Sequence, residues 1–235
     1  MKLVITGDSH TKSLSDAFEA APPRTDIEIT CKPVCSGAAF REPFHEVTRE
    51  GVRFTDSAYQ KRLEILSGSR HFVASSDMRY GLMMGFHTAG IYRDPTWVRH
   101  APSGLAAKLG LQAVSSQVIR AIGLDRQRNV LAFFEALKAA GVNFFAMSAP
   151  PPRRSHPCLR RGISAATLLT VDKLARTACA DRLREAGIPI LLPPEQTIDP
   201  EGFLLPPYEQ KEKGDHHHAN VTYGAIMLRN AIALC

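Results

Sequence analysis

The sequence contains no long apolar run and no paired cysteine motif. Its first apolar stretch runs only from Leu3 to Ile5, whereas the apolar core of a secretory leader needs about 7–15 residues. No later run approaches the ~18 apolar residues of a membrane span. The 5 cysteines include no C-x-x-C pair, which favours reduced thiols over a disulfide framework. The sequence therefore predicts a cytoplasmic protein without a membrane span.

A strong charge of one sign is also missing. The chain has 29 Lys and Arg against 23 Asp and Glu, and the basic residues are scattered through helix-like stretches. Because no stripe combines basic and aromatic residues, we expect no nucleic-acid partner. The 235 residues, 44% of them hydrophobic, are typical of a globular chain with one sizeable core. We therefore expect residues 1–235 to form a single domain.

Short apolar runs alternate with longer helical patterns along the chain. This alternation is typical of an α/β fold with a parallel sheet. The predicted strands are Leu3–Thr6, Ile27–Cys31, Phe72–Ser75, Val142–Met147 and Ile188–Leu192. The predicted helices are His10–Ala20, Ser57–Leu66, Arg126–Ala140, Val171–Ala186 and Val221–Leu234. Phe133 and Phe134 have the spacing of core residues on a helix.

Two segments are rich in glycine or proline and are predicted as loops. They are residues 76–104 and 193–214, and each follows a predicted strand. Open α/β sheets place their sites beyond the carboxyl ends of the strands. The two segments are therefore expected to border a functional site.

The turn after the first strand reads Gly7-Asp8-Ser9-His10. A serine hydroxyl here lies at the carboxyl edge of the sheet, near helix N-terminal amides that favour developing negative charge. Serine is equally typical of a helix N-cap. This turn by itself leaves both roles for Ser9 open.

A second polar motif, Asp215-His216-His217-His218, lies just before the last predicted helix. A serine needs a base to remove its proton, and the usual base is an imidazole oriented by a carboxylate. Asp215 and His218 have a spacing that suits these roles. A metal site is the main alternative, but consecutive histidines rarely converge on one ion and zinc-ligand spacings are missing. An expression tag and ordinary loop residues are the other interpretations, and residues 219–235 beyond the run argue against a tag.

Taken together, the two motifs resemble those of the SGNH (GDSL-type) hydrolase family. That family has a G-D-S turn after its first strand and a D-x-x-H motif before its last helix. The resemblance implies a three-layer α/β/α sandwich with a five-stranded parallel sheet, as in flavodoxin. It also implies Ser9 as nucleophile, His218 as base and Asp215 as its partner, with no metal and no cofactor.

The resemblance further implies an oxyanion hole with three donors. Two are the backbone N–H groups of Ser9 and Gly37, the latter after the second strand, where a simple turn glycine is the alternative. The third is an asparagine side chain after the third strand, and Asp77 stands at that place in this sequence. An ionised carboxylate cannot donate a hydrogen bond. Either Asp77 is protonated, or the two amides suffice, or a neighbour donates instead: Ser75, Ser76 or Arg79.

Arg79 and Arg153 are candidate substrate-binding residues. Arg153 and Arg154 follow the fourth predicted strand and three prolines, and a guanidinium there suits an anionic substrate group. Solvated arginines on a stiff surface loop are the alternative interpretation.

The sequence thus predicts a serine hydrolase that cleaves acyl esters of carbohydrates, lipids or small molecules. Transfer of the acyl group to an alcohol by the same triad is one alternative. A non-catalytic binding module of the same fold is the other, and Asp77 in place of asparagine motivates it.

Overall fold

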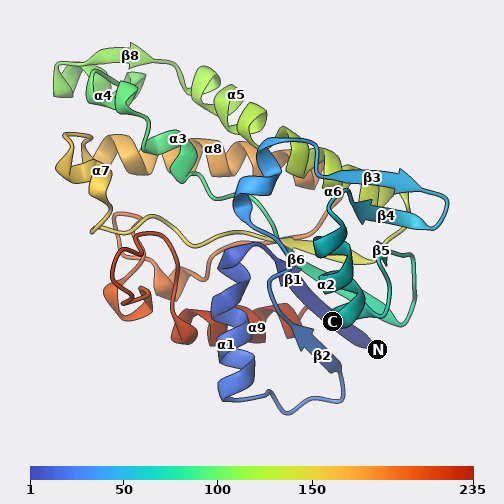
Figure 1. The fold of residues 1–235 in the computed structure, drawn as a ribbon. Coiled ribbons are helices and arrows are strands. Elements are labelled where there is room, and N and C mark those ends of the chain that lie inside the picture. Colours follow the sequence, from blue (N-terminus) through green and yellow to red (C-terminus); the bar gives the residue numbers. More distant parts are fainter.

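The computed structural model describes residues 1–235 and has a five-stranded parallel sheet at its centre (Figure 1). The strands lie in the order β10-β9-β6-β1-β2. Numbered along the chain, this is the order 2-1-3-4-5 of flavodoxin-like folds. The bounds are β1 Lys2–Gly7, β2 Glu28–Cys31, β6 Met78–Met83, β9 Phe144–Met147 and β10 Ile190–Leu191.

Alternating side chains of the central strands feed two cores. In β1, Leu3 and Ile5 pack on one face of the sheet and Val4 packs on the other, as the two-residue period of a strand requires. All three side chains are fully buried. A strand covered on both faces reads as a continuous apolar run, which is why the sequence predicts it well.

Helices cover both faces, so the fold has three layers. Helices α1 and α9 pack on the face of Leu3 and Ile5, whereas α2, α6 and α8 pack on the other. Their bounds are α1 Lys12–Ala20, α2 Ser57–Ser67, α6 Arg128–Ala139, α8 Ala165–Glu185 and α9 Val221–Ile232. The expected α/β/α sandwich with a five-stranded parallel sheet is confirmed. Helix α8 begins six residues before the predicted start at Val171.

The larger core is rich in aromatic side chains, and Phe133 of α6 lies at its centre. Its ring contacts those of Phe44, Phe54 and Phe72 at centroid distances of 5.3, 6.1 and 5.4 Å. Burying a side chain of this size stabilises the fold by roughly 1.5–3 kcal/mol. The prediction that Phe133 and Phe134 are core residues is confirmed.

The predicted third strand, Phe72–Ser75, is wrong. The third strand of the sheet is β6, which pairs with β1 on one side and β9 on the other. Phe72 instead pairs antiparallel with Val52 in a separate sheet. That sheet consists of β3 His45–Thr48, β4 Gly51–Phe54 and β5 His71–Phe72.

The segment 76–104 is therefore not only loop, because it contains β6. Short elements follow it along the chain and continue into a third, smaller core beside α8. These elements are α3 Ala89–Tyr92, β7 His100–Pro102, α4 Ser103–Leu109, β8 Gln112–Val114 and α5 Ser116–Arg126. No helix in the structure combines the length and apolarity needed to cross a membrane.

Candidate active site

The first and last helices lie side by side, which brings the two ends of the chain together (Figure 1). Ser9 precedes α1 and His218 precedes α9. The helices are in close contact at Gly224, where a β-carbon would lie 1.9 Å from the carbonyl oxygen of Ser13. Only a glycine permits this approach, which aligns the two segments at the carboxyl edge of the sheet.

Ser9 lies on a turn that Asp8 caps. The Asp8 carboxylate accepts a hydrogen bond from the N–H of His10 at 2.9 Å. Ser9 itself makes no capping contact, and its Oγ lies 2.8 Å from Nε2 of His218. The hydroxyl is therefore placed for proton transfer to an imidazole, and not for the N-cap role that the sequence left open.

Asp215 holds the other side of the His218 ring. Its Oδ2 lies 2.8 Å from Nδ1 of His218, and its Oδ1 accepts hydrogen bonds from the backbone N–H groups of His217 and His218. Burial acts to raise the pKa of Asp215, but these backbone bonds and the His218 ring outweigh it and lower the pKa to about 2. Asp215 is thus ionised at neutral pH and fixes a proton on Nδ1, leaving Nε2 free to accept one.

Arg153 supports the loop that carries Asp215. Its side chain is 2% exposed and donates hydrogen bonds of 3.0 Å to the carbonyl oxygens of Gln210 and Asp215. Because these bonds point inward, the expectation that Arg153 holds a substrate anion is wrong. Arg154 is exposed and pairs with Asp199 and Glu201.

Two backbone N–H groups of residues that line the larger of two pockets beside Ser9 are available to an anion. Gly37 begins the short helix η2 (Gly37–Arg41) and lines the same pocket as Ser9. Among the hydrogen bonds of the turns and loops, none is donated by the N–H of Ser9 or Gly37. The structure thus brings together four of the residues that the sequence singled out: Ser9, Gly37, Asp215 and His218.

Asp77 and Arg79 lie at the opposite edge of the sheet. The carbonyl oxygen of Asp77 accepts a hydrogen bond from the N–H of Lys2, at the start of β1. Arg79 lies over the Phe145 ring and donates to the carbonyl oxygen of Leu234. Both expectations fail for one reason, because Asp77 precedes the true third strand and Arg79 lies at its start, whereas the site lies beyond its carboxyl end.

The residue that follows the third strand into the site is His87. It is presented by a left-handed turn, in which Gly85 has φ +72° and Phe86 has φ 54°. Phe86 is the only residue other than glycine with a positive φ, and such strain concentrates at functional sites. The Nε2 atom of His87 is buried without a hydrogen-bond partner. Sequence reasoning missed His87 because it placed the third strand too early.

The His87 imidazole is neutral at neutral pH. Burial lowers its pKa to about 3, and the charge of Arg176, with that of His217 when this ring is protonated, acts in the same direction. A network of buried hydrogen bonds holds the turn that carries His87. Arg176 donates to Asp172 and to Ser148 Oγ, while Thr88 donates to Asp172. A neutral ring still carries one N–H donor, which can bind an oxyanion.

Three histidines next to Ser9 form the one group of side chains here that suits a metal ion. The nearest ring nitrogens of His10, His217 and His218 all lie within 4.8 Å of one another. Both nitrogens of His218 are already engaged, with Asp215 and with Ser9. An ion bound to all three rings would therefore displace the Ser9 hydrogen bond.

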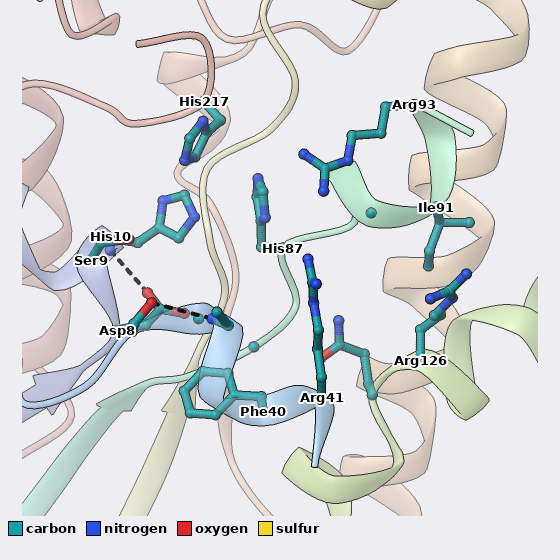
Figure 2. A pocket seen from close by; sticks show the side chains of 16 residues that line it. Asp8, Ser9, His10, Phe40, Arg41, His87, Ile91, Arg93, Arg126 and His217 are labelled. Atoms are coloured by element: carbon teal, nitrogen blue, oxygen red, sulfur yellow. Dashed lines mark hydrogen bonds between the residues drawn. The ribbon is translucent and has the colours of Figure 1, made fainter. Parts of the chain in front are cut away.

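Ser9 lies between two pockets that differ in charge. The first has a volume of about 450 Å³, and Figure 2 shows Arg41, Arg93 and Arg126 around it, with His87 between them and Ser9. The second, of about 360 Å³, has mixed charge and includes Lys12 paired with Asp16. An ester bound at Ser9 can extend into both.

No protein-family model and no curated protein sequence matches the chain. Among solved structures, an extracellular lipase from Streptomyces rimosus is similar, with a TM-score of 0.51 and 15% identity. The match covers 98% of this chain and 99% of the lipase. A GDSL-like lipase from Bacteroides thetaiotaomicron matches with a TM-score of 0.45 and 13% identity, over 99% of this chain and 86% of that one. The esterase EstA from Pseudoalteromonas matches with a TM-score of 0.46 and 12% identity, over 99% and 97%.

The similarity to the Streptomyces lipase spans nearly the whole chain, and at 15% identity it concerns the fold alone. The strand order and the two helix layers agree with that similarity. The chain has an SGNH hydrolase-like fold.

Proposed function

We propose that the protein is a serine hydrolase that cleaves acyl esters. One observation carries this proposal, which is the continuous chain of hydrogen bonds from Asp215 through His218 to Ser9 Oγ, with 2.8 Å at each step. A partly buried carboxylate, an imidazole and an exposed hydroxyl in this order form an activated nucleophile.

The reaction proceeds in two halves. Ser9 Oγ attacks the ester carbonyl while His218 Nε2 takes the hydroxyl proton, and the tetrahedral intermediate collapses as His218 returns that proton to the leaving alcohol. A water molecule then attacks the acyl-Ser9 carbonyl and gives its proton to His218. The acid leaves and Ser9 Oγ regains the proton, so the net reaction consumes one ester and one water.

The negative charge on the carbonyl oxygen needs donors that are already in place. The backbone N–H groups of Ser9 and Gly37 are two candidates, because no loop or turn acceptor takes them. His87 is the third, since its buried Nε2 lacks a partner and its ring lines the same pocket. In this proposal His87 takes the role that the family resemblance assigns to an asparagine after the third strand.

Hydrolysis is favoured over acyl transfer by the exposure of Ser9. Its side chain is exposed and borders both pockets, so water reaches the acyl group. A non-catalytic binding module has less support, because the distances around His218 already suit proton transfer.

The test is turnover of 4-nitrophenyl acetate, together with labelling by a fluorophosphonate probe. We expect both in the wild type, neither in Ser9→Ala, and both in the control Ser116→Ala, which removes an exposed serine of α5. A chelator should leave turnover unchanged, because the proposed steps use only side chains and backbone groups. Labelling that persists in Ser9→Ala would contradict the proposal.

A further inference from the structure

The larger pocket beside Ser9 carries a concentration of positive charge. Arg41 of η2, Arg93 after α3 and Arg126 at the end of α5 come from three separate elements and line this one pocket. In Figure 2 the side chains of Arg41 and Arg93 extend toward the space beside His87, and Arg126 lies beyond them next to Ile91. Separate elements that supply the same group to one cavity indicate a common ligand.

No carboxylate is in salt-bridge contact with the three arginines, although Asp94 lies near enough to Arg126 for this guanidinium to help lower the Asp94 pKa. All three are exposed, and none forms an ion pair with a carboxylate. Elsewhere in the chain arginines commonly pair, as Arg120 does with Asp181 at 2.8 Å. The three guanidinium groups are therefore free to bind an anion, and guanidinium groups match phosphate and carboxylate through two parallel hydrogen bonds.

The rest of the pocket offers these arginines little negative charge. Its one acidic residue is Asp8, which is buried. The Oδ2 atom of Asp8 lies 3.6 Å from the position that a β-carbon on Gly37 would take. Burial raises the pKa of Asp8 to about 7, although backbone hydrogen bonds from His10 and Gly85 oppose the rise. The histidines that line the wall, His10, His87 and His217, all have lowered pKa values, chiefly through burial, and are neutral. The three arginines thus supply most of the charge in this pocket, and the histidines that line it are uncharged.

The chemistry of the lining also limits the size and polarity of the ligand. Only three of the sixteen lining residues are hydrophobic, namely Ala38, Phe40 and Ile91. A long acyl chain would gain little apolar burial in such a pocket. A volume of about 450 Å³ suits a small polar group.

We propose that the natural substrate is a short-chain acyl ester of a phosphorylated alcohol, with the phosphate bound by Arg41, Arg93 and Arg126. Three unpaired guanidinium groups match a dianionic phosphate better than a singly charged carboxylate. The smaller pocket has three carboxylates, Asp16, Glu212 and Asp215, against two lysines, so the phosphate binds on the other side of Ser9. This inference rests on the proposed hydrolase function, because it assigns the leaving alcohol of that reaction.

The first test compares 1-acetylglycerol 3-phosphate with 1-acetylglycerol. We expect the phosphate ester to have the higher kcat/KM by about 100-fold, since each of the three exposed charged pairs contributes up to about fivefold. The preference should shrink as salt rises, because exposed charges are screened within about 8 Å at physiological ionic strength. Equal kcat/KM values for the two esters would overturn the proposal, and so would a stronger preference for an ester with a carboxylate in place of the phosphate.

The second test assigns the preference to the three arginines. In Arg41→Gln/Arg93→Gln/Arg126→Gln, the ratio of the two kcat/KM values should fall close to one. The matched control replaces three exposed, unpaired arginines outside the pocket, Arg24, Arg49 and Arg229. That control should keep the wild-type ratio, and a ratio that falls equally in both triple variants would contradict the assignment.

The third test does not depend on catalysis. Ser9→Ala should bind glycerol 3-phosphate in calorimetry, whereas it should not bind glycerol, and the arginine triple variant should lose this binding. If glycerol 3-phosphate binds but no ester is hydrolysed, the hydrolase proposal fails and the phosphate site stands. If 4-nitrophenyl acetate is hydrolysed but glycerol 3-phosphate does not bind, the phosphate site fails and the hydrolase proposal stands.

Discussion

Gly224 of α9 lies directly against the backbone of Ser13 in α1. A β-carbon at Gly224 would lie 1.9 Å from the Ser13 carbonyl oxygen and 2.3 Å from its carbonyl carbon. These are backbone atoms inside a helix, so they cannot move aside as a flexible side chain would. This contact sets the distance between the two helices and, with it, the distance between the segments of Ser9 and His218.

Gly224→Ala should therefore lower both stability and activity. Forcing a methyl group into this contact should cost at least about 1–3 kcal/mol in the free energy of unfolding, and the separated helices should weaken the Ser9–His218 hydrogen bond. Chemical denaturation and ester turnover measure the two effects. The control Gly104→Ala places a methyl group in α4 where no atom lies within 4 Å, and it should leave both quantities close to wild type. Wild-type stability in Gly224→Ala would show that the helices separate without cost.

Asp215→Asn tests the orientation of the His218 ring. An asparagine still accepts the backbone hydrogen bonds of His217 and His218, but its NH₂ group cannot accept the proton on Nδ1 of His218. The ring should then take the wrong tautomer, and kcat should fall by about 10⁴-fold. The exposed Asp26 supplies the control, because Asp26→Asn should keep wild-type kcat. A loss smaller than tenfold in Asp215→Asn would remove Asp215 from the mechanism.

His87→Ala tests the proposed oxyanion donor. Loss of one such donor lowers kcat by about 10²–10³-fold, whereas KM for a neutral ester should change little because the charge appears only in the transition state. His87→Asn retains an N–H donor and should recover part of the loss. His100 lies outside the pocket, so His100→Ala serves as the matched control. A change confined to KM would indicate that His87 binds substrate and does not stabilise the oxyanion.

How far the sequence predicted the site depended on the third strand. The two motifs predicted that Ser9, His218 and Asp215 lie together with Gly37 beside them. The continuous apolar runs predicted the strands of the central sheet other than β6. Strand β6 was missed because it reads Met78-Arg79-Tyr80-Gly81-Leu82-Met83, which interrupts the apolar pattern twice. The structure explains both interruptions. Gly81 makes room for the Phe145 ring, which lies 2.9 Å from a β-carbon built there, and Arg79 reaches past the sheet edge to Leu234.

Other parts of the site had no sequence signal at all. Arg41, Arg93 and Arg126 lie far apart in the chain, and only the packing of η2 against α6 and of α3 against α5 brings them to one pocket. Arg153 was expected to face substrate because it follows a strand, but its contacts with Gln210 and Asp215 turn it inward. These contacts depend on long-range loop geometry, which local patterns do not encode.

Asp8 predicts a pH dependence of stability. Burial raises its folded-state pKa from 3.8 to about 7, although backbone hydrogen bonds from His10 and Gly85 oppose the rise. Because the folded pKa lies above the unfolded one, the folded protein binds the extra proton between these values. The protonated Asp8 carboxyl group therefore contributes to the free energy of unfolding fully below about pH 4, and this contribution is lost as the pH rises through about 7.

Asp8→Asn removes this titration, so its effect on stability should depend on pH. Relative to wild type, the variant should become more stable by up to about 4 kcal/mol on going from about pH 4 to about pH 8, at 1.36 kcal/mol per pKa unit. Comparing the two pH values cancels any constant effect of the amide on the turn, and denaturant titrations of both proteins measure the difference. Asp26→Asn, at an exposed site, should show no such change. A difference between Asp8→Asn and wild type that is the same at both pH values would mean that Asp8 is already ionised in the folded protein at about pH 4.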